Sequence, residues 1–291
     1  MNQSPLNPLT VSSLLTHANE SLSHQQIPTP RLDAEVLLAR VLKTDRKGLY
    51  LSLPNTVSEQ EKKTLQYLIS RRINGEPISY IIGRKEFWSL SFKVNPAVMI
   101  PRPETETLVE VALKIFSSRS SPSILEIGTG SGAISIALAV ELPRASIIAV
   151  DISPEALTVA KENAFSHGVR SIRFIAGNLF EPLEGERTAF DLIISNPPYI
   201  PTNEIPHLPP GIRDHEPAVA FDGGVDGLEF YRKIAQDAHY YLKPGGYLLL
   251  EFGKDQGQEV AKIISETQKF SSPEIIKDLS GLERVVKTYR I

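Results

Sequence analysis

The four residues Asn196-Pro197-Pro198-Tyr199 form a motif suited to recognising a planar group that ends in NH₂. The two prolines fix two φ angles and lack N–H groups, so the backbone is stiff and its carbonyl oxygens are free. The Asn196 side-chain oxygen can accept one proton of the NH₂ group and the Pro197 carbonyl the other, while Tyr199 lies against the planar acceptor. The other interpretation is a proline-rich turn that ends a strand. We take Asn196, Pro197 and Tyr199 as candidate catalytic residues, and all four as the candidate substrate site.

An amide or aromatic amine nitrogen is a poor nucleophile because its lone pair is delocalised. Hydrogen bonds to both of its protons favour a pyramidal nitrogen, whose lone pair can then attack a methyl group in line. Such a displacement needs mainly positioning and charge stabilisation, with no strong base. The six histidines agree with this chemistry, because none has an obvious metal or triad spacing.

A second motif, Gly128-Thr129-Gly130-Ser131-Gly132, follows a β-rich run and precedes a helix expected to begin near Ala133. Glycines at such a turn let the backbone bend tightly and let a ligand approach the chain. Asp151 follows 23 residues after Gly128, at the end of the next expected strand, where a carboxylate can accept hydrogen bonds from both hydroxyls of a ribose.

The glycine pattern alone leaves the ligand open, because Gly128, Gly130 and Ala133 also satisfy the relaxed fingerprint of a dinucleotide site. NAD, S-adenosylmethionine and a purely structural turn are all compatible with it. Glu126, just before the first glycine, favours a cationic ligand without phosphates, since an additional carboxylate would repel a pyrophosphate. S-adenosylmethionine fits that description, because it has an ammonium group and a sulfonium centre.

Both motifs lie in a stretch where short β-rich runs alternate with helical segments, which predicts a parallel, doubly wound α/β sheet with helices on both faces. In such sheets ligands bind at the carboxyl ends of the strands. A closing antiparallel pair is expected over residues 274–278 and 284–290. The other expected strands cover residues 123–127, 147–150, 172–175, 191–195 and 247–252.

The first part of the chain predicts helices over residues 10–22, 31–42 and 58–74. In the second of these, Ala34, Leu37, Leu38, Val41 and Leu42 recur with the spacing of one apolar helix face. Ser58 and Glu61 have the spacing of a capping box, and Asn74-Gly75 signals a helix end. An alternating stretch, residues 87–94, predicts a short hairpin that joins two domains.

Composition excludes several kinds of chemistry. The 291 residues include no cysteine, so no disulfide, iron–sulfur cluster or thiolate nucleophile can form. Residues 1–99 carry 12 basic and 8 acidic side chains, whereas residues 100–291 carry 19 and 26. The acidic second part is a poor electrostatic match for nucleic acid.

Residues 1–30 contain neither Lys nor Arg, so we expect no secretory signal or transit peptide there. No apolar run approaches the roughly 18 residues of a membrane span. We therefore expect a cytoplasmic protein that does not bind membranes. Nothing signals an obligate interface, so we also expect a monomer.

The sequence resembles the glutamine-N5 methyltransferases of peptide-chain release factors, the PrmC/HemK family. The resemblance extends over nearly the whole chain and rests on several motifs in the order found in the family. These are Arg31-Leu32-Asp33-Ala34-Glu35, Gly75-Glu76-Pro77-Ile78, Glu86-Phe87-Trp88, the segment from Ile100 to Glu106, the loop from Glu126 to Gly132, Asn196 to Tyr199, Glu216-Pro217 and Gly223-Gly224-Val225-Asp226-Gly227-Leu228.

The resemblance implies S-adenosyl-L-methionine as methyl donor and a release factor as partner, with the glutamine of its Gly-Gly-Gln tripeptide as acceptor. It also implies a Rossmann-like class I methyltransferase sheet of seven strands with an antiparallel C-terminal hairpin. The implied domains are a helical substrate-recognition domain (1–84), a hairpin linker (85–101) and a methyltransferase domain (102–291). The implied cofactor contacts are Glu126, Gly128, Thr129, Gly130, Ser131, Gly132, Asp151, Asn178, Leu179 and Asn196.

Four points stay open from sequence. Family members often have Asp where Asn178 stands, but Asn can still accept a hydrogen bond from the adenine amino group. Residues 102–106 either shape the pocket entrance or serve as a domain linker, and residues 200–226 are interpreted as a lid over the substrate. The alternative function is a nucleic-acid adenine-N6 or guanine-N2 methyltransferase, because the same motif fits any planar NH₂ group.

Overall fold

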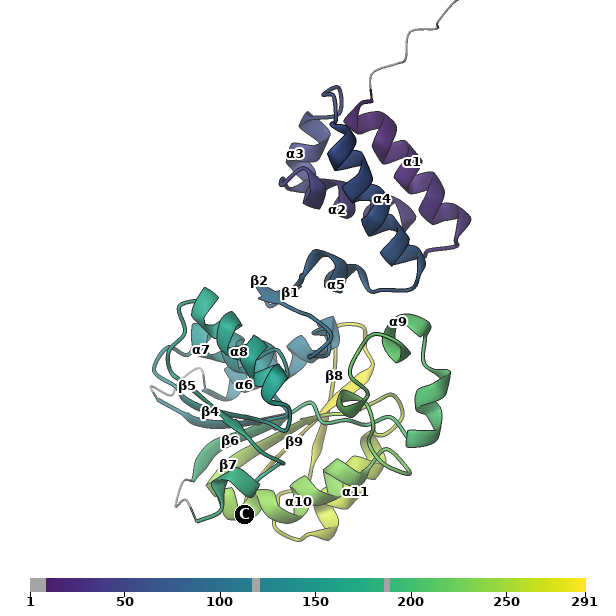
Figure 1. The fold of residues 1–291 in the computed structure, drawn as a ribbon. Coiled ribbons are helices and arrows are strands. Elements are labelled where there is room, and N and C mark those ends of the chain that lie inside the picture. Colours follow the sequence, from purple (N-terminus) through teal and green to yellow (C-terminus); the bar gives the residue numbers. More distant parts are fainter. Residues whose placement is uncertain (1–8, 117–120, 186–188) are drawn as a thin grey trace, which may run out of the picture. The chain divides into compact units, whose positions relative to one another are not determined.

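A computed structural model describes residues 9–116, 121–185 and 189–291. Residues 1–8, at the start of the segment in which we expect no signal, lie outside these ranges. The chain divides into two compact units, the helical unit (Met1–Gly83 with Pro210–His215) and the sheet unit (Arg84–Pro209 with Glu216–Ile291). Figure 1 shows the elements of each unit. The short segment 210–215 therefore groups with the helical unit, although it lies inside the stretch interpreted above as a lid.

The helical unit contains the three helices expected from sequence, each with ends within two residues of the prediction. Their bounds are α1 (Val11–His24), α2 (Pro30–Val41) and α4 (Glu59–Ile73). The predicted capping box is present at α4, since Ser58 Oγ accepts from the Glu61 N–H while the Glu61 carboxylate accepts from the Ser58 N–H. The sequence patterns did not indicate the shorter helices of this unit, namely α3 (Arg46–Leu51), α5 (Ile78–Ile82) and α9 (Pro210–Arg213).

Helix α2 buries more than its apolar face. Ala34, Leu37 and Leu38 lie in the core as expected, but Asp33 and Glu35 are also only 3% and 2% exposed. Each buried carboxylate has basic partners, because a buried charge without one is strongly destabilising. Arg72 pairs with Asp33 at 2.7 Å, and Arg31 and Arg46 pair with Glu35 at 2.8 and 2.6 Å. The acidic residues of the motif from Arg31 to Glu35 thus hold α2 to its neighbours.

The hairpin begins three residues earlier than expected and consists of β1 (Arg84–Phe87) and β2 (Leu90–Lys93). Its two turn residues, Trp88 and Ser89, have φ angles of 52° and 58°, the left-handed conformation that a tight two-residue hairpin turn requires. The Trp88 indole N–H donates to Glu141 at 2.9 Å, and the Lys93 N–H donates to Asn163 at 2.7 Å. The hairpin is therefore attached to the sheet unit.

The sheet unit is built on a seven-stranded sheet with the order β5-β4-β3-β6-β7-β9-β8. The strands β3 to β7 run parallel, and β9 pairs antiparallel with both β7 and β8. This confirms the predicted class I methyltransferase sheet with its antiparallel C-terminal pair. The bounds are β3 (Ser123–Ile127), β4 (Ser146–Asp151), β5 (Ile172–Ala176), β6 (Phe190–Ser195), β7 (Leu242–Glu251), β8 (Glu274–Lys277) and β9 (Glu283–Tyr289).

Strand β7 departs most from its prediction, because it begins at Leu242, before the expected start at residue 247. The intervening sequence, Lys243-Pro244-Gly245-Gly246, has the composition of a turn. Its backbone nevertheless continues to pair, since the Gly245 N–H donates to the Arg290 carbonyl at 2.9 Å and the Arg290 N–H donates to Gly246 at 2.8 Å. Tertiary pairing with the C-terminal segment thus overrides local turn propensity.

Helices cover both faces of the sheet, as expected for a doubly wound fold (Figure 1). One hydrophobic cluster joins α6 (Glu106–Phe116), α7 (Ala133–Glu141) and α8 (Pro154–Ser166) to one face. A second cluster joins α10 (Glu229–Tyr241) and α11 (Gly257–Glu266) to the other. None of the helices in the described ranges has both the length and the apolar character required to cross a membrane.

Strand β3 has β4 on one side and β6 on the other, and the chain order reverses at this point. In open α/β sheets the crevice for ligands lies at such a position, outside the carboxyl ends of the strands. The glycine loop follows β3, Asp151 ends β4, and Asn196 follows β6. The topology therefore brings the two sequence motifs to one edge of the sheet.

Candidate functional site

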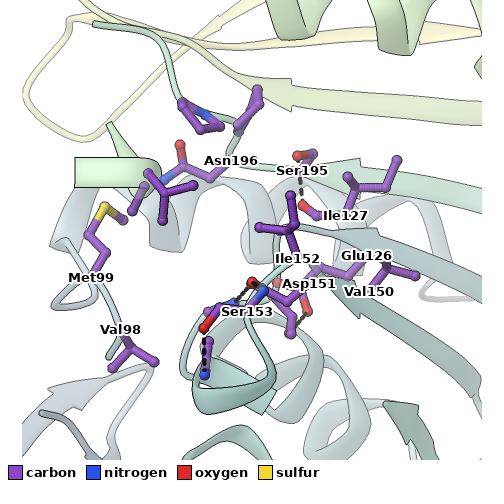
Figure 2. A pocket seen from close by; sticks show the side chains of 18 of the residues that line it. Val98, Met99, Glu126, Ile127, Val150, Asp151, Ile152, Ser153, Ser195 and Asn196 are labelled. Carbon is purple, nitrogen blue, oxygen red and sulfur yellow. Dashed lines mark hydrogen bonds between the residues drawn. The ribbon is translucent and has the colours of Figure 1, made fainter. Parts of the chain in front are cut away.

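A pocket opens at the carboxyl edge of β3, β4 and β6, and its walls come from the residues that end these strands (Figure 2). Glu126 and Ile127 end β3, Asp151 ends β4, and Ser195 ends β6. The Ser195 hydroxyl donates to the Ile127 carbonyl at 2.7 Å, which fixes the ends of β3 and β6 relative to each other. Both predicted motifs therefore contribute to one site.

The glycine loop is held against β4 by its own backbone. The Gly128 and Thr129 N–H groups both donate to the Val150 carbonyl, at 2.8 and 3.0 Å. The Gly130 N–H donates to the Asp151 carboxylate at 2.7 Å. Gly128 and Gly130 have φ angles of 73° and 55°, which explains why glycine stands at these turn positions. The loop is thus already shaped, by main-chain hydrogen bonds, as a cradle beside Asp151.

Among the loop residues predicted to hold the cofactor, Gly128, Thr129, Gly130 and Ser131 line the pocket and Gly132 does not. Gly132 has a different role. A Cβ at this position would lie 2.9 Å from Ile136 Cδ1 and 3.2 Å from Ala160 Cβ, so the missing side chain lets the loop pack closely against α7 and α8.

Glu126 lies beneath the loop and is only 1% exposed. Its Oε2 atom accepts from the Thr129 hydroxyl at 2.6 Å, from the Ser135 N–H at 3.2 Å and also from the Ser135 hydroxyl. Burial raises the pKa of Glu126 to about 7, against the opposing effect of these hydrogen bonds. This residue lines the pocket, and the loop and the first turn of α7 supply the donors to its carboxyl group.

Asp151 lies at the centre of the cofactor side of the pocket. Its two oxygens accept separate main-chain bonds, Oδ1 from Ser153 at 2.9 Å and Oδ2 from Gly130 at 2.7 Å. A carboxylate oxygen has more than one acceptor position, so each oxygen can still accept a ligand hydroxyl. Burial raises the Asp151 pKa. The next residue, Ile152, is apolar yet 56% exposed, and it also lines the pocket.

Asn178 and Leu179 follow β5 and both line the pocket, as the resemblance implies for residues beside an adenine. The Asn178 amide donates to Glu181 at 3.2 Å, which leaves its carbonyl oxygen available as an acceptor. Leu179 has a φ angle of 50°, an uncommon conformation for a leucine, and one that the fold maintains at a pocket wall.

On the opposite side of the pocket lie Asn196, Pro197 and Pro198. The Asn196 Nδ2 atom donates to Thr105 Oγ1 at 3.1 Å. In the part of the chain that the structure describes, the Asn196 Oδ1 atom has no hydrogen-bond donor, so it is free to accept from a ligand. The side-chain amide therefore presents its oxygen as the available acceptor, as the sequence motif predicts.

Tyr199, the fourth residue of the motif, is not among the residues that line the pocket. It is enclosed by glycines instead, since a Cβ on Gly253 would lie 2.8 Å from Tyr199 Cδ2 and one on Gly223 would lie 2.8 Å from Tyr199 Cα. Gln256 donates to the Tyr199 carbonyl at 2.9 Å. Burial, and then the nearby negative charge of Glu251, raise the Tyr199 pKa, so the hydroxyl stays neutral.

Sequence reasoning anticipated only part of the third wall of the pocket, because residues 102–106 were considered for the pocket entrance but the segments that pack beside them were not. This wall is built from two segments that Glu216 joins, because this buried carboxylate accepts from the Ile100 N–H at 2.9 Å and from Arg102 at 2.6 Å. The motifs Pro101 to Glu106 and Glu216-Pro217 were both noted in the sequence. Nothing in the sequence indicated that Glu216 pairs with Arg102. The residues of this wall are Ala97, Val98, Met99, Pro101, Thr105, Pro217, Val219 and Ala220.

The composition of the pocket discriminates between the ligands that the sequence left open. None of the described lining residues is Lys, Arg or His, so the pocket offers no cationic side chain to a pyrophosphate. It offers the carboxyl groups of Glu126 and Asp151, the amide of Asn178 and the apolar side chains of Ile152 and Leu179. This set fits a nucleoside joined to a cationic group, as in S-adenosylmethionine. Within the described residues no cluster of His, Asp and Glu is placed to hold a metal ion.

Two family models match this chain. The first is the PrmC N-terminal domain, over residues 13–83, and the second is a methyltransferase domain, over residues 118–285. The second match includes β3, β4 and β6 and the loops that follow them, but not residues 97–105 of the third wall. The two matched regions thus follow the order of the helical unit and the sheet unit along the chain.

Curated relatives match nearly the full length. A release factor glutamine methyltransferase from Geobacter sulfurreducens is 42% identical over 277 residues, which is 95% of each chain. One from Moorella thermoacetica is 41% identical over 283 residues, covering 97% of this chain and 99% of the relative. Among solved structures, a methyltransferase from Pyrococcus furiosus aligns with a TM-score of 0.52 and 20% identity, over 76% of this chain and 96% of that one, and it supports the fold alone.

Proposed function

We propose a site mechanism for this chain, which belongs to the release factor glutamine methyltransferase family. The protein is an S-adenosylmethionine-dependent enzyme that methylates a glutamine side chain of peptide-chain release factors. One observation carries the assignment of the site. The Asn196 amide is tied down through its nitrogen and presents a free oxygen at the edge of the pocket that also contains Asp151.

On the cofactor side, we assign Asp151 to the ribose hydroxyls, because each of its oxygens retains an acceptor position beside its main-chain bond. Asn178 would accept from the adenine amino group, and Leu179 and Ile152 would supply apolar walls for the ring. The glycine loop would lie along the remainder of the ligand. Glu126 would favour the ammonium or sulfonium group as the nearest carboxyl group beneath the loop.

On the acceptor side, Asn196 Oδ1 and the Pro197 carbonyl would accept the two protons of the glutamine amide, at N5, in the Gly-Gly-Gln tripeptide. Pro198 holds this backbone stiff, since it removes an N–H donor and fixes a φ angle. Tyr199 would lie beside the planar amide, in the position that Gly223 and Gly253 leave for it. Accepting both protons favours a pyramidal nitrogen with an exposed lone pair.

S-adenosylmethionine supplies an activated methyl group, whose bond to sulfur breaks as its bond to the amide nitrogen forms in line. The protein then has two tasks, to align the nitrogen and to stabilise the positive charge that develops on it. The carbonyl oxygens of the Asn196 side chain and the Pro197 backbone would perform both tasks, because their partial negative charges would face the two N–H groups of the amide. A methylated amide cation is a strong acid, so one proton leaves to water without a protein base.

We assign recognition of the release factor to the helical unit. This unit, residues 1–83 with 210–215, carries 10 basic and 8 acidic side chains, a slight positive balance that suits an acidic protein partner. Leu51 and Tyr67 are 76% and 62% exposed on this unit and are candidate contacts. We further propose that the enzyme acts as a monomer in the cytoplasm, where release factors work, and that it does not bind nucleic acid directly.

A transfer assay with isotope-labelled S-adenosylmethionine tests the function. Release factor, a release factor whose Gly-Gly-Gln glutamine is replaced by alanine, DNA and RNA are offered separately. The proposal predicts label in the unaltered release factor only. Label in nucleic acid, or undiminished label in the glutamine variant, would overturn it. The same assay on short peptides and on whole release factor shows how much recognition lies outside the tripeptide.

A further inference from the structure

We infer that Thr105 and Glu251 are positioning residues that orient the Asn196 side-chain amide, so that its oxygen and not its nitrogen faces the substrate. This inference deepens the proposed function and rests on it, because it concerns the group assigned to the glutamine amide. Thr105 belongs to the short 3-10 turn η1 (Pro103–Thr105), and Glu251 is the last residue of β7. Thr105 lies in the segment 102–106, for which a place at the pocket entrance was one of two interpretations, whereas Glu251 was not singled out from sequence.

The need for such residues follows from the shape of an asparagine side chain. Its oxygen and nitrogen are nearly equal in size, so a rotation by half a turn exchanges acceptor and donor at little steric cost. With Nδ2 facing the pocket, two N–H groups would oppose each other and the glutamine nitrogen would lose one of its two acceptors. The orientation of this one amide therefore decides whether the substrate can be held.

The structure places the Asn196 nitrogen on Thr105, with 3.1 Å between Nδ2 and Oγ1. Thr105 is itself only 5% exposed, and its backbone N–H is fixed by the Arg102 carbonyl at 3.1 Å. A threonine hydroxyl can donate or accept, however, so Thr105 alone does not select one orientation of the amide. A further group must decide which role the hydroxyl takes.

Glu251 is that group. Strands β6 and β7 pair in register, with Ser195 opposite Leu250, so the residues that follow, Asn196 and Glu251, lie at the carboxyl ends of neighbouring strands. Burial raises the pKa of the Glu251 carboxyl group to about 7, and hydrogen bonding by the Thr105 and Asn196 side chains opposes that rise. Above that pH the carboxylate is ionised and only accepts, so the Thr105 proton points to Glu251 and the Thr105 oxygen is left to accept from Asn196. One fixed acceptor thereby sets the direction of both hydrogen bonds.

No other role for Glu251 is evident in the described part of the chain. It is 2% exposed, and its Oε2 atom has no hydrogen-bond partner there. An unpaired buried carboxyl oxygen is destabilising, so a fold that retains one for stability alone would be unusual. Arg284 on β9 offsets part of the negative charge, while Glu104 on η1 adds to it, and the phenol rings of Tyr199 and Tyr231 lie nearby.

A double-mutant cycle on turnover tests the inference. Thr105→Val keeps the side-chain shape but removes the hydroxyl, and we expect kcat to fall about tenfold, the loss of one buried hydrogen bond. In the Asn196→Ala background the same substitution should change kcat less than about twofold, because the amide on which Thr105 acts is gone. Thr105→Ser, which restores the hydroxyl, should recover most of the activity. The dissociation constant for S-adenosylmethionine should change less than about twofold in Thr105→Val and Thr105→Ser.

Glu251→Gln provides the second arm, because its amide can donate as well as accept and so no longer enforces one orientation. We expect a fall in kcat of about tenfold, again lost in the Asn196→Ala background. The matched control is Thr288→Val, which removes another buried threonine hydroxyl, one that donates to Ser271 at 2.7 Å. It should lower the melting temperature while leaving kcat unchanged.

Additive losses from Thr105→Val and Asn196→Ala, or normal kcat in both Thr105→Val and Glu251→Gln, would overturn the inference. If Thr105→Val does not fold, Glu251→Gln carries the same cycle, and normal or additive turnover in that cycle overturns the inference equally. Near-normal turnover in Asn196→Ala alone would instead contradict the proposed function. The two failures are therefore distinguishable in one set of variants.

Discussion

The two halves of the pocket, which we assign to the cofactor and to the methyl acceptor, differ in the hydrogen bonds that each provides to its buried carboxyl group. In the cofactor half, Glu126 accepts three hydrogen bonds from Thr129 and Ser135, all within its own loop and helix. In the acceptor half, Glu251 keeps an oxygen without a hydrogen-bond partner in the described part of the chain. Burial raises the pKa of both groups to about 7.

This difference indicates where the site is self-sufficient and where it depends on its ligand. In the cofactor half, local hydrogen bonds already hold the loop in place, so its residues contribute mainly to protein stability and to cofactor affinity. The acceptor half depends on how the Asn196 side-chain amide is oriented, and we infer that Glu251 sets this orientation through Thr105. We therefore expect substitutions in the acceptor half to change turnover, and substitutions in the cofactor half to change binding and folding.

The largest effect is expected for Asn196→Ala, which removes the acceptor aimed at the reacting nitrogen. Loss of one such transition-state hydrogen bond lowers turnover on the order of 10² to 10³. Single-turnover rates at saturating S-adenosylmethionine measure the effect directly. Turnover within a few-fold of the unaltered enzyme would remove the basis of the comparison.

Asp151→Asn is expected to weaken S-adenosylmethionine binding by roughly 10- to 100-fold, the range for a hydrogen bond to a charged group. Asparagine keeps the size of the side chain, but only one of its two terminal atoms accepts, so it cannot serve Gly130, Ser153 and two ribose hydroxyls together. Isothermal titration gives the affinity. Unchanged affinity would show that Asp151 serves only the loop.

Gly132→Ala is expected to lower stability by about 2 kcal/mol, because the new Cβ would lie 2.9 Å from Ile136 Cδ1 at a φ angle of 82°. Gly168→Ala is the matched control. Its φ angle is 69° with no atom within 4 Å of the added Cβ, so it should show only the smaller backbone penalty of about 1 kcal/mol. Urea unfolding of both variants measures the difference, and equal losses would contradict the packing role assigned to Gly132.

The smallest effect concerns pH and stability. The folded-state pKa of Glu251, about 7, lies above its ordinary value of 4.5, so the folded protein binds the proton more tightly than the unfolded chain. Stability should fall as the pH rises from about 4.5 to about 7 and then stay low. Glu251→Gln should therefore stabilise the protein by about 1 kcal/mol at pH 8 and show a smaller gain at pH 5. Melting temperatures at the two pH values test this, and a gain that is larger at pH 5 would contradict the raised pKa.

Much of the fold was readable from sequence, because its elements have strong local patterns. The strands with continuous apolar runs and the capped helices appear within a few residues of their predicted ends. The exceptions are elements that tertiary pairing creates, such as the start of β7 through Gly245, where the local composition favours a turn. The short helices α3 and α5 have too few residues for a periodic pattern.

The candidate site divides in the same way. Residues within one motif, such as Gly128 to Ser131 or Asn196 to Pro198, were predicted and do line the pocket. The roles of Thr105 and Glu251 were not predicted, although residues 102–106 were considered for the pocket entrance, because these roles depend on Asn196 from a distant part of the chain. Tyr199 and Gly132 were predicted to face the ligand but are not among the lining residues, since a motif does not reveal which of its side chains point toward neighbouring elements.

The most direct test of the comparison is to measure two quantities for the same pair of variants, Glu126→Gln and Glu251→Gln. The first quantity is the dissociation constant for S-adenosylmethionine, and the second is the single-turnover rate of release factor methylation at saturating cofactor. We expect Glu126→Gln to weaken cofactor binding and to leave the saturated rate near normal. We expect Glu251→Gln to lower the saturated rate about tenfold and to leave cofactor binding near normal. If both variants change the two quantities in the same proportion, the division of the pocket into two such halves is wrong.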